Sequence, residues 1–212
     1  MGNEEEEVST SHLDVLREIG TMGAGRAATA LSEIINTTVE ISVPEAKLIP
    51  AAQFASIVSA EEKTSFVLVI VLEGELGGRV FFLLSPHEAR MLGAMLLCTE
   101  PDKISFEDAM FQSSIKEALN IIVGAYMAAL SELTGYEIMF SVPYLALDVL
   151  TAVFIAEQTP QRSADMICIK TQLKIRGSNF DGAFVFFPDL PSIKKIFKAL
   201  RLEETDRHSK PA

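Results

Sequence analysis

Two polar residues, Glu117 and Asn120, interrupt the otherwise mostly apolar stretch from Ser113 to Pro143. The stretch has the pattern of a long helix, and residues three apart on a helix lie on the same face. A carboxylate and a carboxamide would therefore project side by side, and an amide both donates and accepts hydrogen bonds. Such a pair is either a polar seam or solvated helix face without function, or a small functional patch.

Other chemistries find little support in the sequence. The three histidines are scattered, which argues against a histidine-based catalytic or metal site. Gly20, Gly23 and Gly25 form a glycine-rich segment, but no strand precedes it and no Lys-Ser/Thr pair follows it, so it does not resemble a nucleotide-binding loop. We interpret Gly25 and Gly124 instead as positions where two long helices approach each other closely.

The composition is that of an acidic protein with enough apolar residues for a substantial core. The chain has 212 residues, 49% of them hydrophobic, and a net charge of −11, which argues against nucleic acid or a membrane surface as the main partner. Cys98 and Cys168 lie in apolar runs and are predicted to be buried, reduced thiols. The acidic start does not resemble a signal peptide, and no apolar run has the length of a membrane span. We therefore expect a cytoplasmic protein.

Hydrophobic periodicity and turn residues predict the elements of the first half of the chain. The expected elements are a helix over 11–35, a strand over 39–43 that stops at Pro44, a hairpin over 65–85, a helix over 86–98 and a linker at 99–103.

The second half shows the same kinds of pattern. The expected elements are a helix from about Ser105 to Thr134, a strand over 136–142 stopped by Pro143, a helix over 145–158, hairpin strands over 167–175 and 183–187, and a final amphipathic helix over 192–200. For the long helix, Asp108 stands at the capping-box spacing after Ser105, and Gly135 is a natural C-terminal cap.

The two halves also share residues at a constant separation. Adding 99 to a residue number maps Glu18 onto Glu117 and carries Ser42-Val43-Pro44 onto Ser141-Val142-Pro143. Residues that recur in both halves because they pack in the core should be apolar or glycine. Glu18 and Glu117 are charged instead, and each stands within one of the two long helices. The repeat therefore favours a functional patch over an accident of packing.

The repeat predicts the fold class and the domain organisation. We expect an α+β, internally duplicated fold with a pseudo-two-fold axis, an antiparallel sheet and long helices that carry the two copies of the polar pair. Residues 1–10 are predicted to be an acidic disordered leader, and 203–212 a frayed tail. Residues 11–202 are predicted to form one domain of two repeats, about 11–98 and 105–202, because each repeat alone is a thin unit.

The spacing of the polar residues resembles that of a known family. The pattern Asp/Ser-x3-Glu-x2-Asn-x22-Pro is typical of the CheC/CheX/FliY family of chemotaxis phosphatases, and the resemblance extends over about residues 11–200. The second copy is complete, with Ser113, Glu117, Asn120 and Pro143. The first copy has Asp14, Glu18 and Pro44, but Thr21 stands in place of the asparagine. Two copies without a further C-terminal domain fit the CheC branch best, and the resemblance implies a CheC-like fold.

The resemblance implies an enzyme that removes the phosphoryl group from an aspartate of the response regulator CheY. Asn120 would orient the attacking water, and Glu117 would pair with the regulator's active-site lysine. Ser113 and Pro143 would support this site, as Asp14 and Pro44 would support the first. No cofactor or metal of the chain's own is implied, since Mg²⁺ is expected in the regulator. The family also implies CheD as a second partner.

Thr21 is the residue that makes the first predicted site different from the second. Its side chain is shorter than asparagine and its rotamers are restricted by β-branching, so Glu18 and Thr21 are predicted to form a degenerate first site. We expect Glu117 and Asn120 to carry most or all of the activity. The alternative is a non-catalytic adaptor that uses the same helix faces to bind CheD or phosphorylated CheY.

Overall fold

A computed structural model of the chain describes residues 10–42, 44–50, 66–146 and 165–200. The predicted tail at 203–212 lies outside the described residues, as does the predicted leader except for Thr10, which begins the first helix.

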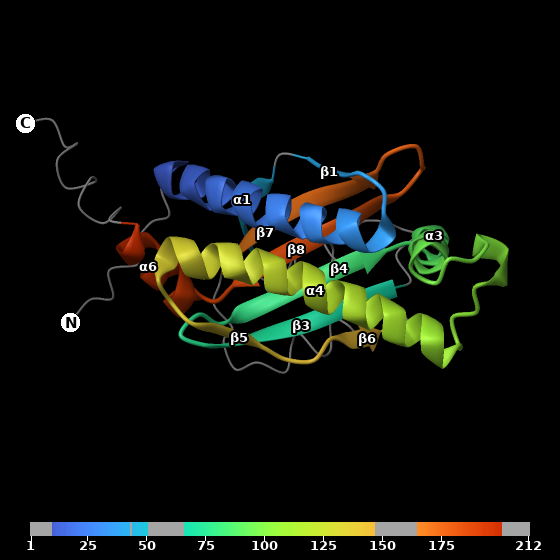
Figure 1. Cartoon of the computed structure of the whole chain (residues 1–212). Helices are drawn as coiled ribbons and strands as arrows, with labels where there is room; N and C mark the ends of the chain where they lie inside the picture. Colours follow the sequence, from blue (N-terminus) through green and yellow to red (C-terminus); the bar gives the residue numbers. More distant parts are fainter. Residues whose placement is uncertain (1–9, 43, 51–65, 147–164, 201–212) are drawn as a thin grey trace, which may run out of the picture.

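A layer of helices covers one face of an antiparallel sheet (Figure 1). The described helices are α1 (Thr10–Ile35), α3 (Pro86–Leu96), the 3-10 helix η2 (Pro101–Lys103), α4 (Ala109–Thr134) and α6 (Leu190–Ala199). The described strands are β1 (Val39–Ile41), β2 (Glu45–Pro50), β3 (Phe66–Gly74), β4 (Gly78–Leu84), β5 (Ile138–Phe140), β6 (Tyr144–Ala146), β7 (Asp165–Ile175) and β8 (Asp181–Pro188). The predicted α+β class is confirmed.

The two halves of the chain complete each other's part of the sheet. The strand order is β1-β7-β8-β4-β3-β5, with β2 also paired to β7 and β6 to β3. The short strands of each half therefore pair with a long strand of the other half. Neither half has a complete sheet alone, and the element order of the first half recurs in the second. Descent of the halves from a duplicated unit stays a prediction.

Ser42 and Pro44 lie between β1 and β2, as Ser141 and Pro143 lie between β5 and β6, and at each place the register has a β-bulge of one extra residue. From Ile41 to Glu45 the chain advances four positions while its partner β7 advances three, from Leu173 to Lys170. The same extra residue occurs opposite β3, between the pairs of Phe140 and of Tyr144. The predicted strands do end before their prolines, at Ile41 and at Phe140, but a second short strand begins after each proline and pairs with the same long strand. A bulge does not need the N–H that proline lacks, so pairing resumes after it.

A serine anchors each bulge to the neighbouring long strand. The Ser42 amide donates to the Gln172 carbonyl, and the Gln172 amide donates to the Ser42 hydroxyl oxygen, both over 3.0 Å. Ser141 makes the same pair of bonds with Val71, at 2.9 and 3.1 Å. The serine of the repeated triplet therefore has a structural function in both halves.

The helices α1 and α4 lie side by side over the sheet and run in opposite directions (Figure 1). Tyr126 of α4 is fully buried between them and the sheet, where its ring stacks on Phe184 at 4.9 Å. Burial raises the pKa of the Tyr126 hydroxyl far above its ordinary value. A Cβ atom on Gly23 of α1 would stand 2.8 Å from the Tyr126 ring.

The glycine that permits this close approach is therefore Gly23, and the prediction for Gly25 and Gly124 is wrong. A Cβ atom on Gly25 would meet nothing within 4 Å, and one on Gly124 would meet only the Phe140 ring, at 3.7 Å. The contact between the two long helices thus requires neither glycine. Glycine is costly inside a helix, so packing does not account for these two positions.

Alanine substitutions on α1 distinguish the two kinds of glycine. Gly23→Ala is expected to lower the free energy of unfolding by about 1–3 kcal/mol, because the new methyl group overlaps a tightly packed ring. Gly25→Ala is expected to raise it by about 0.5–1 kcal/mol, because helix propensity improves and nothing is displaced. Urea unfolding of both variants measures the difference, and a shift in the same direction for both would contradict this packing.

Three further predictions differ from the structure. The helix α4 begins at Ala109, not near Ser105, because Asp108 is its N-cap and accepts a hydrogen bond from the Met110 amide. The first two residues of the helix predicted over 145–158 belong instead to strand β6, which pairs with β3; the rest of that predicted helix, 147–158, lies outside the described residues. Cys98 is exposed in the turn after α3, whereas Cys168 is buried as predicted.

Candidate functional site

The polar pair of the second half lies on the outer face of α4. The inward face is apolar and buried, with Ile115, Leu119 and Ile122 among its residues. Glu117 is exposed and Asn120 is partly exposed, since both lie on the side away from the sheet. Ser113, one turn before Glu117, is also exposed. The amphipathic pattern of α4 therefore presents these three polar side chains together to solvent.

The described residues around this site leave its polar side chains available. Within the described part of the chain, none of Ser113, Glu117 and Asn120 forms a side-chain hydrogen bond or ion pair. A carboxylate and an amide on a rigid helix are thus available to a partner without first breaking internal contacts. This availability favours recognition of another molecule over a structural role.

The equivalent residues of α1 are more constrained. Glu18 and Thr21 are both exposed, and they occupy the same positions in a helix of equal length, 26 residues. The Thr21 hydroxyl donates to the Arg17 carbonyl over 2.9 Å, one turn back. Asp14 forms an ion pair with Arg17. Two of the three polar groups at this site therefore make bonds within α1, whereas the Glu18 carboxylate, like that of Glu117, has no bond to another described residue.

The two prolines of the predicted motifs are buried, whereas the glutamates of both motifs are exposed. Pro44 packs under α1 at Gly20, where a Cβ atom would stand 3.0 Å from the proline Cβ. The residue equivalent to Gly20 in α4 is Leu119, which is buried. The structure therefore brings Pro44 next to the helix turn that carries Thr21, on the side opposite to solvent. From this position a proline can support the helix but cannot contact a ligand of the polar pair.

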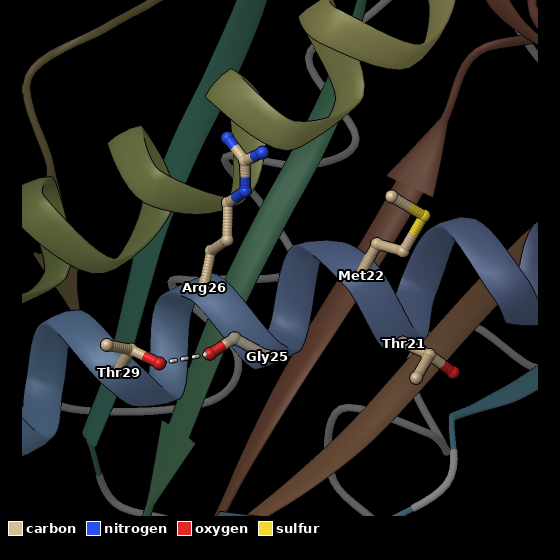
Figure 2. A pocket seen from close by; sticks show the side chains of 5 residues that line it. All are labelled: Thr21, Met22, Gly25, Arg26 and Thr29. Carbon is tan, nitrogen blue, oxygen red and sulfur yellow. Dashed lines mark hydrogen bonds between the residues drawn. The ribbon is translucent and has the colours of Figure 1, made fainter.

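A shallow hollow extends along α1 beyond Thr21 (Figure 2). Its lining residues are Thr21, Met22, Gly25, Arg26 and Thr29. The Arg26 side chain points from the hollow toward α4 and forms a bidentate ion pair with Glu132. This ion pair lowers the pKa of the Glu132 carboxyl. Neither Met22 nor Arg26 is singled out by the sequence pattern. Because Arg26 corresponds to Ala125, this ion pair has no counterpart across the repeat.

Neither a metal centre nor a membrane helix is found in the described residues. No group of three or more His, Cys, Asp or Glu side chains there is arranged to hold a metal ion. None of the helices described is both long and apolar enough to cross a membrane.

The sequence matches known proteins along most of its length. Residues 12–48, which hold the first motif copy, match the model of the CheC-like family. The chain is 28% identical over 200 residues to the CheY-P phosphatase CheC of Bacillus subtilis (strain 168), and the alignment covers 91% of this chain and 95% of that protein.

The fold matches solved structures of the same group. FliY of Thermotoga maritima superposes with a TM-score of 0.73 at 21% identity, over 93% of this chain and 100% of that one. The FliM middle domain from H. pylori superposes with a TM-score of 0.66 at 15% identity, over 91% and 99%. CheX from Desulfovibrio desulfuricans superposes with a TM-score of 0.56 at 15% identity, over 81% and 99%.

The solved structures show the fold of the chain, and the curated relative shows a similarity in sequence. The fold is the one shared by CheX, FliY and FliM proteins. Within that class the sequence resembles CheC over nearly the whole chain, so the resemblance predicted from the two motif copies is confirmed. The chain is thus similar to a group that includes chemotaxis phosphatases.

Proposed function

We propose that this protein is a chemotaxis phosphatase that hydrolyses the aspartyl-phosphate of the response regulator CheY. The observation that carries the proposal is the Glu117–Asn120 pair on α4, with Glu117 exposed, Asn120 partly exposed and neither bonded to another described residue, in a chain similar to a protein named CheY-P phosphatase. The site lies on a rigid helix, which suits a reaction that depends mainly on positioning.

The regulator provides the reactive group in this mechanism. Its phosphoryl group is bound to its own aspartate, and Mg²⁺ held by the regulator offsets the negative charge, so the chain contributes no cofactor. The Asn120 amide accepts a hydrogen bond through its oxygen and donates one through its nitrogen, and with both groups it holds a water molecule in line with the phosphorus atom. Glu117 pairs with the regulator's lysine and thereby fixes the helix over the phosphoryl group. Water attacks phosphorus, the bond to the aspartate oxygen breaks, and inorganic phosphate leaves.

The first site differs in the group that would orient water. The Thr21 hydroxyl gives its hydrogen to the Arg17 carbonyl, so only its oxygen lone pairs face solvent. It can accept a hydrogen bond from water but cannot also donate one while that bond lasts. Glu18 keeps a free carboxylate, so this site retains a means of docking without a full means of hydrolysis.

Restoring the asparagine is expected to activate the first site. Thr21→Asn, made in a protein whose second site carries Asn120→Ala, should raise phosphoryl loss at least about 5-fold above the Asn120→Ala parent, because the amide supplies both hydrogen-bonding groups. The rate is measured as phosphate release from phosphorylated CheY. Thr21→Ser in the same parent is the control, and equal rates for the two variants would contradict the assignment of Thr21 as the defect.

A second candidate is an adaptor that binds without hydrolysis, in the cytoplasm, to CheD or to phosphorylated CheY. The observation in its favour is that a protein of the same fold, FliM from H. pylori, has been solved in complex with FliG, at a TM-score of 0.65 to this chain. In α1 the Glu18 carboxylate is exposed while the Thr21 hydroxyl is bonded to the Arg17 carbonyl, which suits a face that docks on a partner without orienting water.

The rate of phosphoryl loss from phosphorylated CheY, with and without this protein, separates the two functions. A phosphatase accelerates the loss catalytically, with many turnovers per molecule. An adaptor leaves the rate unchanged or lowers it by covering the site. Absence of acceleration by the wild-type protein would therefore overturn the proposed function.

A further inference from the structure

An exposed apolar side chain stands one turn after the glutamate of each motif. Met22 follows Glu18 by four residues, and Ile121 follows Glu117 by four residues, so the two are equivalent across the repeat. Their exposed fractions are nearly equal, 42% for Met22 and 40% for Ile121. Large apolar side chains are normally scattered on a surface, whereas these two recur at one position beside both polar pairs.

A glycine accompanies each of these apolar residues. Gly25 lies one turn after Thr21, and Gly124 lies one turn after Asn120. Neither glycine is required by packing, since an added Cβ would meet nothing within 4 Å at Gly25 and only a 3.7 Å contact at Gly124. Beside each exposed apolar residue the helix therefore has a position without a side chain, and in α1 both Met22 and Gly25 line the hollow (Figure 2).

On each helix the polar pair, the exposed apolar residue and the glycine form one continuous strip. In α4 the strip consists of Glu117 and Asn120 followed by Ile121 and Gly124, and none of the four is buried in the apolar core. A partner whose lysine reaches the Glu117 carboxylate must cover the next turn of the same helix face, because one turn rises only about 5.4 Å. Whatever engages the polar pair thus also contacts Ile121.

We propose that Ile121 and Gly124 form an apolar seat for the surface of the phosphorylated regulator that surrounds its aspartyl-phosphate. Ile121 is buried by that surface on binding, and Gly124 allows it to approach the helix backbone. Met22 and Gly25 form the corresponding seat at the first site. The proposal rests on the proposed function, and it assigns affinity for the regulator to groups that take no part in hydrolysis.

Ile121→Ala tests the apolar seat, because loss of the seat should raise KM and leave kcat unchanged. The variant is expected to raise KM for phosphorylated CheY about tenfold, because a largely buried aliphatic side chain contributes about that factor to an interface. The value of kcat should stay within about twofold of the wild type. Ile121→Met, which introduces the residue found at the equivalent position 22, should restore KM to within about twofold.

The matched control is Ile34→Ala, which removes an isoleucine of similar exposure, 36%, from the other long helix. It should match Ile121→Ala in thermal stability and leave KM unchanged. Gly124→Ala provides a second test, since it should raise the melting temperature through better helix propensity while weakening binding at least about fivefold. Binding is measured with CheY carrying beryllofluoride in place of the phosphoryl group.

The outcomes separate the seat from the proposed function. Wild-type acceleration of phosphoryl loss, together with unchanged KM for Ile121→Ala, would overturn the seat and leave the phosphatase intact. If Gly124→Ala binds beryllofluoride-CheY as tightly as the wild type, the regulator does not approach the helix backbone at Gly124, and that part of the proposal is overturned. Absence of wild-type acceleration would overturn the phosphatase itself, whereas weakened beryllofluoride-CheY binding by Ile121→Ala would then still support the seat.

Discussion

Asn120→Ala is expected to lower the kcat for phosphoryl loss from phosphorylated CheY by about 100-fold or more, close to the regulator's unassisted rate. The regulator already supplies the electrophile and the metal, so the proposed phosphatase adds chiefly a positioned water. Fixing a reactant in line contributes several orders of magnitude in favourable cases, and the amide is the group proposed to do so. Phosphate release at saturating regulator, compared with the wild type, measures the loss.

The fold should survive this substitution. Asn120 is only partly buried and makes no side-chain hydrogen bond in the described chain, and alanine is the better helix former. We expect an unchanged or higher melting temperature and nearly unchanged binding of beryllofluoride-CheY. Asn120→Asp keeps the shape but cannot donate a hydrogen bond, so it should also lose most of the activity. A kcat near the wild-type value for either variant would contradict the role given to the amide.

Glu117→Gln is expected to raise KM for phosphorylated CheY about 30-fold or more, with a smaller decrease in kcat. The substitution keeps the size and removes the charge, which leaves the regulator's lysine without its ionic partner. Loss of one member of a hydrogen-bonded charge pair in an interface costs about 2–5 kcal/mol, mostly through faster dissociation. Steady-state kinetics over a wide range of regulator concentration separates the two parameters.

The chain offers a close control for this substitution. Glu33 is an exposed glutamate on the other long helix, outside the motif, and Glu33→Gln makes the same change in net charge. It should leave KM within about twofold of the wild type. Equal effects of the two substitutions would point to the overall negative charge of the protein as the cause, and would contradict a specific pairing of Glu117 with the lysine.

The long helices and the central hairpins are predictable from the sequence because local pattern decides them. Both long helices have a strong apolar periodicity, and Gly135 ends α4 in the left-handed conformation, with a φ of 74°. The hairpin of β3 and β4 lies where β-rich runs flank the glycines. Local signals are sufficient wherever neighbours in the sequence are also neighbours in space.

Prediction from the sequence fails where pairing partners are distant along the chain. Pro44 and Pro143 indicate strand ends correctly, because proline cannot donate a ladder hydrogen bond, but they do not reveal that β2 and β6 follow and pair with β7 and β3. The bulges depend on serines 130 and 70 residues away from their partners, Gln172 and Val71. No local pattern specifies which long strand a three-residue strand will join.

The sequence is enough to select the residues of the candidate site, but it does not predict the hydrogen bonds and packing around them. The charge retained at Glu18 and Glu117 across the repeat is enough to indicate the two helix faces. The bond from Thr21 to Arg17 depends on the rotamer that the threonine adopts, which no sequence pattern specifies. Gly23 and Gly25 show the same limit, since two glycines in one segment have opposite environments that only the position of Tyr126 distinguishes.

The most direct test of the proposed phosphatase compares two double variants that remove one site each. Phosphate release from phosphorylated CheY is measured with the wild type, with Glu18→Ala/Thr21→Ala, and with Glu117→Ala/Asn120→Ala. We expect the first double variant to retain most of the wild-type acceleration and the second to lose nearly all of it. Acceleration that survives loss of Glu117 and Asn120, or a wild-type protein that accelerates nothing, would contradict hydrolysis at the face of α4.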